Sequence, residues 1–431
     1  MKQNTRTIIK RLTGTVLITT TAFSLFACKG PAVQTQSSDL MKDLNVQTVE
    51  NRELDDTFRS AAADFSIELF RQSAAKEAAA GNNVLISPES VLSALAMTAN
   101  GANETTLLEM EDVLCGGMDI QDFNSYMYTY NNKLTATEDV DFHLANSIWI
   151  KDNPAEIQVK EDFLQTDRNY YNADAFLADF DDTTVKDINN WVDTNTNGMI
   201  SQLLNEIPDG VVMYLINALA FEGAWETPYE EKQVNENGTF TNHLGNEETV
   251  AMLGSTESQY ITGDHVTGFV KNYKGGDYAF LALLPEEGTT VEEYLSSMDG
   301  SSFLSLYDNR SYQDVLVQIP EFTYDYDTEL SEPLTAMGME NAFTTTADFS
   351  QMADTNTGCL YINRVLHKTY IQVDRAGTKA AAVTAVEMTN EAAMIDPVAP
   401  PTVYLNRPFV YAIIDTETGL PIFIGAVNTI E

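Results

Sequence analysis

Residues 367–386 read HKTYIQVDRAGTKAAAVTAV, and this stretch decides the fold. Its first part is typical of an extended strand, which Gly377 then interrupts. On alternate positions from Thr378 to Met388 no side chain is charged, because Lys379 and Glu387 fall on the opposite set. This alternation is typical of a loop that can enter a sheet as a strand without burying a charge. Since alanine favours helices, a helix over the same residues is an equal alternative.

The flanking sequence decides between these alternatives. The stretch resembles the reactive-loop hinge of the serpin family, and further blocks similar to serpin motifs follow in family order over roughly residues 55–431. Any one block is a weak signal, whereas the ordered series is highly specific. The blocks are NVLISPESVLSALAMTANGANETTLLEM (83–110), INNWVDTNTNGMISQLL (188–204), LINALAFEGAW (215–225), VLVQIPEFTYDY (315–326), MGMENAF (337–343), ADFSQM (347–352), LYINRVLHK (360–368) and NRPFVYAIIDTETGLPIFIGAV (406–427).

The pattern of elements predicts an α+β fold, because helices concentrate in the first half and strands in the second, without βαβ alternation. We expect helices over 57–79, from Pro88 onward, and opening at Ile188–Val192. The predicted strands cover 142–150, 213–221, 279–284, 316–326, 365–373, 409–414 and 422–427. The resemblance implies the serpin fold: three β-sheets, about nine helices, an exposed reactive-centre loop, and a five-stranded central sheet that accepts a sixth strand.

Composition limits the partners. The chain of 431 residues carries 24 basic and 64 acidic side chains, a formal charge of −40. Binding to nucleic acid through phosphates is therefore excluded, and cationic partners are favoured. Acidic runs such as residues 178–182 are expected to be solvated surface rather than metal ligands, so we expect neither metal nor cofactor. No linker or repeat interrupts the chain after about residue 55, which predicts one domain over 55–431.

The N-terminus reads as an export signal. Residues 1–27 begin with basic side chains and continue as an uncharged stretch too short to span a membrane, which predicts a signal peptide. Leu25–Cys28 resembles a bacterial lipobox, and this implies a bacterial lipoprotein that carries lipid on Cys28 and is held at the extracellular side of the cell envelope. An ordinary signal peptide is the alternative. Residues 28–54 are polar and aperiodic, which predicts a flexible tether.

Only Cys115 and Cys359 remain beyond the leader. Each stands beside an apolar residue, so buried free thiols are expected, although a disulfide between them stays open for an exported protein.

Catalytic motifs such as GxSxG, HExxH and a P-loop are absent, and the histidines are scattered. The chain is therefore expected not to be an enzyme.

The resemblance also implies two structural sites around the central sheet. The family places a polar cluster beneath the sheet, and the matching residues here are Ser87, Ser90, Asn217 and His367. Such a buried cluster has to satisfy all its hydrogen-bonding groups. Trp225 matches a family tryptophan near the top of the sheet opening, called the breach. The alternative for Trp225 is plain core packing.

The activity implied by the resemblance is inhibition of serine endopeptidases, or alternatively cysteine endopeptidases, by suicide-substrate trapping. A protease attacks the loop and forms an acyl-enzyme, the cut loop inserts into the central sheet, and the displaced protease cannot deacylate. The hinge residues that matter are Gly377, Thr378, Ala380, Ala381 and Ala382. A non-inhibitory serpin-like binding or chaperone protein is the alternative, which bulky, proline or charged inward hinge residues would favour, and none is present.

Family spacing places the reactive bond at Glu391–Ala392, with Asn390, Ala393 and Met394 as alternatives. Glu391 would suit a glutamate-selective protease, whereas the small or apolar residues would suit elastase- or subtilisin-like enzymes. No Arg or Lys lies in 389–401, so trypsin-like targets are disfavoured. The protein is expected to be monomeric.

Four charges depart from the family pattern. Arg375 stands where the family usually has Glu, Lys379 replaces a common Glu, and Glu222 and Glu321 replace usual Lys residues. The salt bridges near the hinge are therefore not predictable from the resemblance, but the inward-facing hinge positions are unaffected.

Overall fold

The computed structural model describes residues 35–430 except 154, 156, 357–358 and 379–398. No helix within these residues is long and apolar enough to cross a membrane. Their helices are α1 (Asp56–Ala80), α2 (Pro88–Ala99), α3 (Glu104–Cys115), α4 (Ile120–Leu134), α5 (Glu161–Tyr171), α6 (Asp182–Asn195), α7 (Val291–Ser296), α8 (Gly300–Asp308) and α9 (Ser331–Ala336), with 3₁₀ turns at Glu231–Gln233 and Asn341–Phe343.

Sheet A has the strand order β1-β5-β3-β6-β15-β14-β12. Its strands are β1 (Ser38–Asp39), β5 (Asp174–Ala178), β3 (Val140–Lys151), β6 (Met213–Ala224), β15 (Gly377–Thr378), β14 (Leu366–Val373) and β12 (Phe322–Glu329). Without the two-residue strands β1 and β15, the seven strands reduce to five (7 − 2), the central sheet that the resemblance implies. Of the strands that the structure describes, only β15 lies between β6 and β14.

Sheet B has the order β16-β11-β8-β9-β10-β17-β18-β2, with β7 paired to β8, and a third sheet pairs β13 with β4. The strands are β16 (Thr402–Tyr404), β11 (Ser311–Pro320), β8 (Glu247–Gly263), β9 (Val266–Asn272), β10 (Tyr278–Pro285), β17 (Phe409–Asp415), β18 (Pro421–Val427), β2 (Val84–Ile86), β7 (Val234–Thr241), β13 (Ala353–Thr355) and β4 (Ile157–Val159). The described residues thus form three sheets and a mixed α+β fold, as expected.

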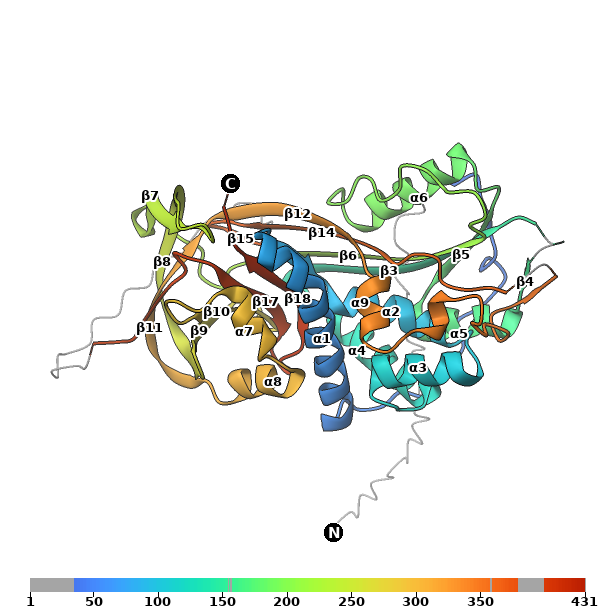
Figure 1. Cartoon of the computed structure of the whole chain (residues 1–431), viewed down its shortest axis with the longest axis horizontal. Helices are drawn as coiled ribbons and strands as arrows, with labels where there is room; N and C mark the ends of the chain where they lie inside the picture. Colours follow the sequence, from blue (N-terminus) through green and yellow to red (C-terminus); the bar gives the residue numbers. More distant parts are fainter. Residues whose placement is uncertain (1–34, 154, 156, 357–358, 379–398, 431) are drawn as a thin grey trace, which may run out of the picture. The chain divides into compact units, whose positions relative to one another are not determined.

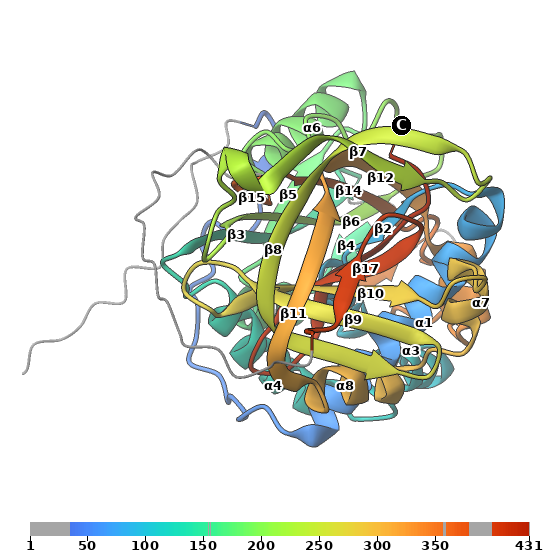
Figure 2. The same cartoon turned by 90° about the vertical axis from the view of Figure 1, so that its left-hand side faces the viewer.

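Sheet A separates α6 from the other helices (Figure 1). α6 lies on one face, while α1, α2 and α9 pack on the other. Figure 2, turned by 90°, presents β8 and β11 of sheet B to the viewer. The predicted start of α2 is confirmed: Ser87 caps it, with Pro88 in the first turn. α1 ends at Gly81, whose φ of +77° suits glycine.

Two predicted elements have wrong boundaries. α6 begins at Asp182 and runs through Ile188 instead of opening there, because Asp181 accepts hydrogen bonds from the N–H groups of Thr183 and Thr184 and caps the helix. The strand predicted over 316–326 is two strands in different sheets. β11 ends at Pro320, a residue without an N–H, and β12 begins two residues later at Phe322.

Residues 35–54 lie against the domain, so the predicted tether is wrong for this segment. Asp187 of α6 accepts hydrogen bonds from the N–H groups of Gln36 and Ser37, and β1 extends sheet A by pairing with β5. Met41 is buried in the core. The segment is polar because it contributes mainly backbone and hydroxyl hydrogen bonds, which leave no apolar periodicity in the sequence.

Both described cysteines are free thiols. Cys115 is buried as expected, but Cys359 is exposed, so the prediction of a buried thiol is wrong for Cys359.

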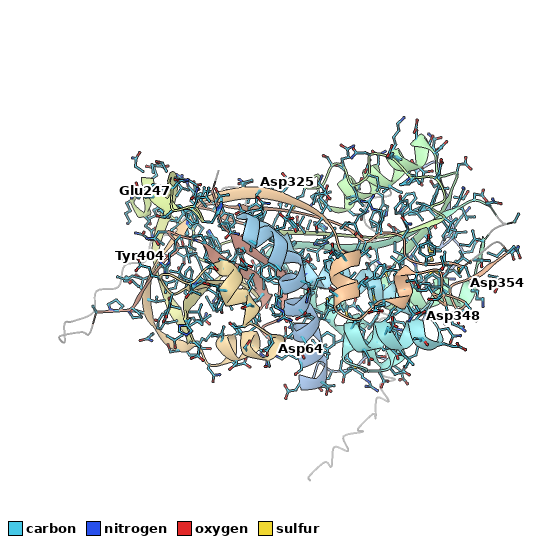
Figure 3. The ribbon with its side chains drawn as sticks, in the orientation of Figure 1. Asp64, Glu247, Asp325, Asp348, Asp354 and Tyr404 are labelled. Atoms are coloured by element: carbon cyan, nitrogen blue, oxygen red, sulfur yellow. The ribbon has the colours of Figure 1, made fainter. Side chains whose placement is uncertain are left out.

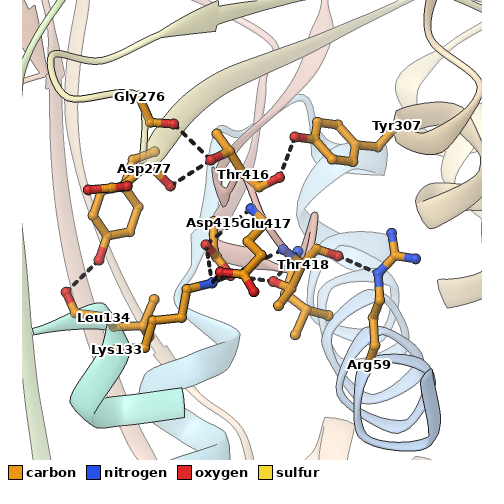
Figure 4. A network of polar contacts seen from close by, with 12 residues as sticks. Arg59, Lys133, Leu134, Gly276, Asp277, Tyr307, Asp415, Thr416, Glu417 and Thr418 are labelled. Carbon is orange, nitrogen blue, oxygen red and sulfur yellow. Dashed lines mark hydrogen bonds and ion pairs between the residues drawn. The ribbon is translucent and has the colours of Figure 1, made fainter. Parts of the chain in front are cut away.

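The C-terminal hairpin is anchored by a buried carboxylate (Figure 4). Asp415 at the end of β17 binds Lys133 Nζ at 2.8 and 2.9 Å and accepts from the Thr418 hydroxyl at 2.5 Å. The β17–β18 hairpin is thereby fastened to α4.

Candidate functional site

The hinge lies between the two middle strands of sheet A. β14 ends at Val373, the chain turns at Asp374, and Gly377–Thr378 return as β15, antiparallel to β14 and β6. Thr378 pairs with Val373 of β14 and Gly223 of β6, and it is 3% exposed. The first inward-facing hinge residue is therefore already inside the sheet.

One carboxylate holds the turn that precedes β15. Asp374 Oδ1 accepts hydrogen bonds from the N–H of Ala376 at 2.7 Å and the N–H of Gly377 at 3.2 Å. The N–H of Asp374 donates to the Gly377 carbonyl at 2.9 Å. Asp side chains commonly satisfy turn N–H groups in this way. The turn thus fixes the point at which the loop enters the sheet.

Trp225 and Tyr273 close the opening above the hinge. The buried Trp225 donates from Nε1 to the Asp374 carbonyl at 2.9 Å and from its backbone N–H to the Ala376 carbonyl at 3.0 Å. Tyr273 stacks on Trp225 with ring centroids 4.7 Å apart, and its hydroxyl lies 2.5 Å from Thr378 Oγ1. Trp225 therefore packs in the core and also binds the hinge backbone directly.

A buried cation supports this aromatic pair. Lys271 is 3% exposed, and its Nζ lies 2.8 Å from Glu257 Oε1 and 4.6 Å from the ring centroid of Tyr229. It also lies 5.4 Å from the Trp225 ring. A buried charge needs such pairing, and aromatic faces add to it. Because Tyr229 N–H donates to the Arg375 carbonyl at 2.9 Å, this packing continues into the hinge.

An ion pair lies on the solvent side of the same turn. Arg375 Nε is 3.0 Å from Glu321 Oε1, and Arg375 Nη2 is 3.2 Å from Glu321 Oε2 and from Glu236 Oε1. Hydrogen bonding to Glu321 raises the pKa of the Arg375 guanidinium. Two charges that depart from the family pattern are therefore complementary and form an ion pair with each other.

Polar residues expected to form a cluster do meet beneath the opening. His367 Nε2 of β14 accepts a hydrogen bond from the N–H of Ser87 at 3.0 Å, and Ser87 Oγ donates to the Ile422 carbonyl at 3.0 Å. Ser90 Oγ donates to Asn217 Oδ1 of β6. Ser87 and Ser90 belong to the first turn of α2 and its cap. One helix end thus holds the strands on both sides of the opening.

The protonation state of His367 follows from this geometry. Nε2 accepts the Ser87 N–H, so a neutral ring carries its proton on Nδ1. Burial lowers the pKa of His367 to about 4. The imidazole is therefore neutral at physiological pH, and it is a structural acceptor rather than a general base.

The cluster extends further than the sequence predicted. Asn217 Nδ2 donates to Asn146 Oδ1 on β3 at 2.7 Å, and Asn146 Nδ2 donates to the Tyr171 carbonyl at 3.1 Å. Asn146 and Asn217 are direct cross-strand partners. The sequence did offer one signal for this extension, because Asn146 is a polar residue inside the otherwise apolar predicted strand 142–150. The resemblance to the family assigned no role to Asn146.

A small cavity of about 40 Å³ lies between β6 and β14. Side chains of α2 lie on one side of it, and residues of α6 and the following segment lie on the other. A strand placed between β6 and β14 would therefore lie between these two layers. Its lining includes Ser87, Ser90, Val91, Val192, Ile200, Leu203, Leu215, Asn217, Leu366 and His367.

Several predicted site residues lie outside the described residues. They are the hinge residues Ala380, Ala381 and Ala382, the reactive-bond candidates Asn390, Glu391, Ala392, Ala393 and Met394, and the lipidation candidate Cys28. Among the residues that the structure does describe, no cluster of His, Cys, Asp or Glu could hold a metal ion.

Comparison with known proteins matches this geometry to one family. The sequence model described as serpin (serine protease inhibitor) matches residues 60–430. Human alpha-1-antichymotrypsin is 26% identical, and the match covers 92% of this chain and 95% of that protein. An uncharacterized serpin-like protein of Thermococcus kodakarensis is 29% identical, and the match covers 85% of this chain and 84% of its own length.

Solved structures give the same result. The native state of the thermophilic serpin tengpin is 46% identical, with a TM-score of 0.85, and the match covers 92% of this chain and all (100%) of that one. The latent state of tengpin is 44% identical, with a TM-score of 0.78, covering 88% of this chain and 100% of that one. The structure is therefore more similar to the native form than to the latent form.

Proposed function

Because the chain belongs to the serpin family, whose members are generally protease inhibitors, we propose that it inhibits serine endopeptidases by covalent trapping. The protease would attack the loop between Thr378 and Thr402 as a substrate and form an acyl-enzyme. The cut loop would then enter sheet A between β6 and β14. Insertion of the reactive loop into sheet A is the serpin form of strand addition to a sheet.

The observation that carries the proposal is the position of β15. Gly377 and Thr378 already occupy the first positions between β6 and β14, so insertion only has to continue an existing strand. Ahead of β15 the two strands are bridged by the first turn of α2, through the hydrogen bonds to His367 and Asn217. These contacts can part and re-form, because both strands are held through single side-chain or backbone hydrogen bonds.

Insertion up to the candidate bond would carry the protease far along the sheet. Glu391 is 14 residues after Gly377 (391 − 377), and at ~3.3 Å per residue the displacement is on the order of 45 Å. Deacylation needs an intact triad and oxyanion hole, so distortion of either would preserve the acyl bond. Residues 389–394 suit elastase-like, subtilisin-like or glutamate-selective targets better than trypsin-like ones.

A panel of purified proteases tests this function. We expect an elastase- or subtilisin-like member to form a complex with the chain that survives boiling in denaturing detergent. The control is the same protease with its catalytic serine replaced by alanine, which cannot form an acyl bond. Quantitative nicking of the loop without any stable complex would instead support the alternative, a non-inhibitory serpin-like binding or chaperone protein.

We also propose that Cys28 is lipidated and holds the protein at the extracellular side of the membrane. The support is the sequence Leu25–Cys28 after a basic and then uncharged leader. Mass spectrometry of the N-terminus from the native host tests it. A diacylated Cys28 supports the anchor, and a free amino terminus on protein recovered from the medium contradicts it.

A further inference from the structure

The outward face of the three strands next to the loop's C-terminal end has an uncharged central area. It consists of alternate residues that the strand register aligns: Gly254 and Thr256 on β8, Leu316 and Gln318 on β11, and Thr402 and Tyr404 on β16. The exposed Asp314 of β11, two residues before Leu316, lies at the edge of this uncharged area. We call these six residues the strand-end face.

The strand-end face exposes large apolar side chains. Leu316 and Tyr404 are each 36% exposed, and Tyr404 lies at the same end of the molecule as β11 (Figure 3). The opposite face of the same strands is conventional core, since Val317 and Val403 are buried. Glu257, the nearest acidic residue on β8, points to that inner side, where it pairs with Lys271.

This face is continuous with the reactive loop. The carbonyl of Pro401 accepts a hydrogen bond from the N–H of Leu316 at 2.9 Å, and the chain then runs directly into β16. Thr402 is 11 residues after Glu391 (402 − 391), so the segment between their Cα atoms spans at most about 40 Å when fully extended. A protease domain of about 250 residues has a diameter of roughly 45 Å. A protease bound to the loop therefore lies within reach of the face.

We propose that the strand-end face is a secondary docking surface for the target protease, with Leu316 and Tyr404 at its centre. The inference rests on the proposed function, because it takes the protease at the loop as the partner. Interface centres are depleted in charge and enriched in tyrosine, and this is the composition found here. The matching surface on the protease would be apolar and uncharged, next to its substrate cleft. Its effect would be on how fast the loop is captured, not on insertion.

The test measures the second-order rate at which subtilisin consumes the intact loop, counting trapped and nicked chains together. This rate does not depend on whether the cleaved chain traps the protease. If every chain were nicked and none trapped, the proposed function would be contradicted, but the rate would still test the docking surface. Leu316→Ala and Tyr404→Ala should each slow consumption about fivefold or more. A synthetic peptide of residues 379–398, which lacks the face, should be cleaved more slowly than the loop in the protein.

Matched controls are Leu108→Ala on α3 and Tyr361→Ala, which remove side chains that are 61% and 39% exposed. Neither control residue is on the strand-end face. Leu108 belongs to α3, and Tyr361 precedes the start of β14, next to Ile362, whose N–H donates to the Ala342 carbonyl. These controls should leave the rate unchanged. Rates within twofold of wild type for both Leu316→Ala and Tyr404→Ala would overturn the proposal. A wild-type dimer that Tyr404→Ala dissociates would also overturn it, because a second copy of the chain would then cover the face.

Discussion

The hydroxyl oxygens of Tyr273 and Thr378 lie 2.5 Å apart inside the protein. Tyr273 follows β9 of sheet B, whereas Thr378 belongs to the hinge strand of sheet A. Both residues are buried, so the hydrogen bond between them is protected from water. The hinge is thus held in the sheet by a side chain as well as by the ladder to β6 and β14.

Thr378→Arg should convert the protein from an inhibitor to a substrate. Because Thr378 already lies inside the sheet, Arg there would expel β15, and insertion would then have to bury an unpaired guanidinium at a cost of several kcal/mol. A rise of about 1.4 kcal/mol in the insertion barrier slows insertion tenfold. Cleavage near Glu391 should continue, because it lies far along the loop. The measurement is the stoichiometry of inhibition, and the control is Lys379→Ala, which the alternation places on the outward set. An unchanged stoichiometry for Thr378→Arg would contradict both the register and the mechanism.

The reversed ion pair can be tested by restoring the family polarity. Arg375→Glu and Glu321→Arg should each lower the free energy of unfolding by about 1 kcal/mol, because each leaves two like charges at a partly exposed site. The double variant should recover most of the loss. Denaturant unfolding of all four proteins gives the coupling energy. Additive losses in the double variant would mean that the pair does not contribute.

His367 should make stability depend on acid. Its pKa falls from 6.5 to about 4 on folding, so the unfolded chain binds a proton that the folded chain does not between these pH values. Stability is therefore lost as pH falls from 6.5 to 4, by on the order of 3 kcal/mol. As pH falls from 6.5 to 4, the free energy of unfolding of His367→Gln should therefore rise relative to that of wild type. His265→Gln, at a ring that is 75% exposed, is the control. Parallel stability profiles for wild type and His367→Gln would refute a buried neutral ring.

Glu89 on α2 should make the stability of the protein depend on pH in the opposite direction. It is buried, its Oε1 accepts a hydrogen bond from the Ser93 hydroxyl, and its Oε2 has no hydrogen-bond partner among the residues that the structure describes. Burial raises its pKa from 4.5 to about 8, so the folded chain keeps a proton that the unfolded chain has lost. Stability should fall as pH rises from 4.5 to 8, by on the order of 5 kcal/mol. Glu89→Gln should remove this slope in thermal melts at several pH values, whereas a slope equal to that of wild type would rule out a protonated Glu89.

Much of the fold was predictable because its signals are local. The Ser87-Pro88 cap of α2 and the alternation of β3 and β14 depend on neighbouring residues, and the structure has these elements where they were expected. The break between β11 and β12 was missed because the apolar pattern continues across Pro320 although the chain changes sheets. The packing of residues 35–54 was missed because it uses backbone hydrogen bonds to α6 and β5.

The site was predictable only where the family pattern is kept. Ser87, Ser90, Asn217 and His367 were found from matching positions, and the structure brings them together. The pairing of Arg375 with Glu321 could not be predicted, since each residue alone departs from the pattern and only the distance between them reveals the compensation. The role of Tyr273 was hidden for a similar reason: 105 residues separate it from Thr378.

The most direct test of the account is the melting temperature of the chain before and after a single cut within residues 389–394. Insertion between β6 and β14 would extend β15 into a full central strand, adding backbone hydrogen bonds along both neighbours. The account predicts that the cut protein melts at a clearly higher temperature than the intact protein, and that Thr378→Arg abolishes the increase. Equal melting temperatures for the cut and intact wild-type chains would contradict loop insertion.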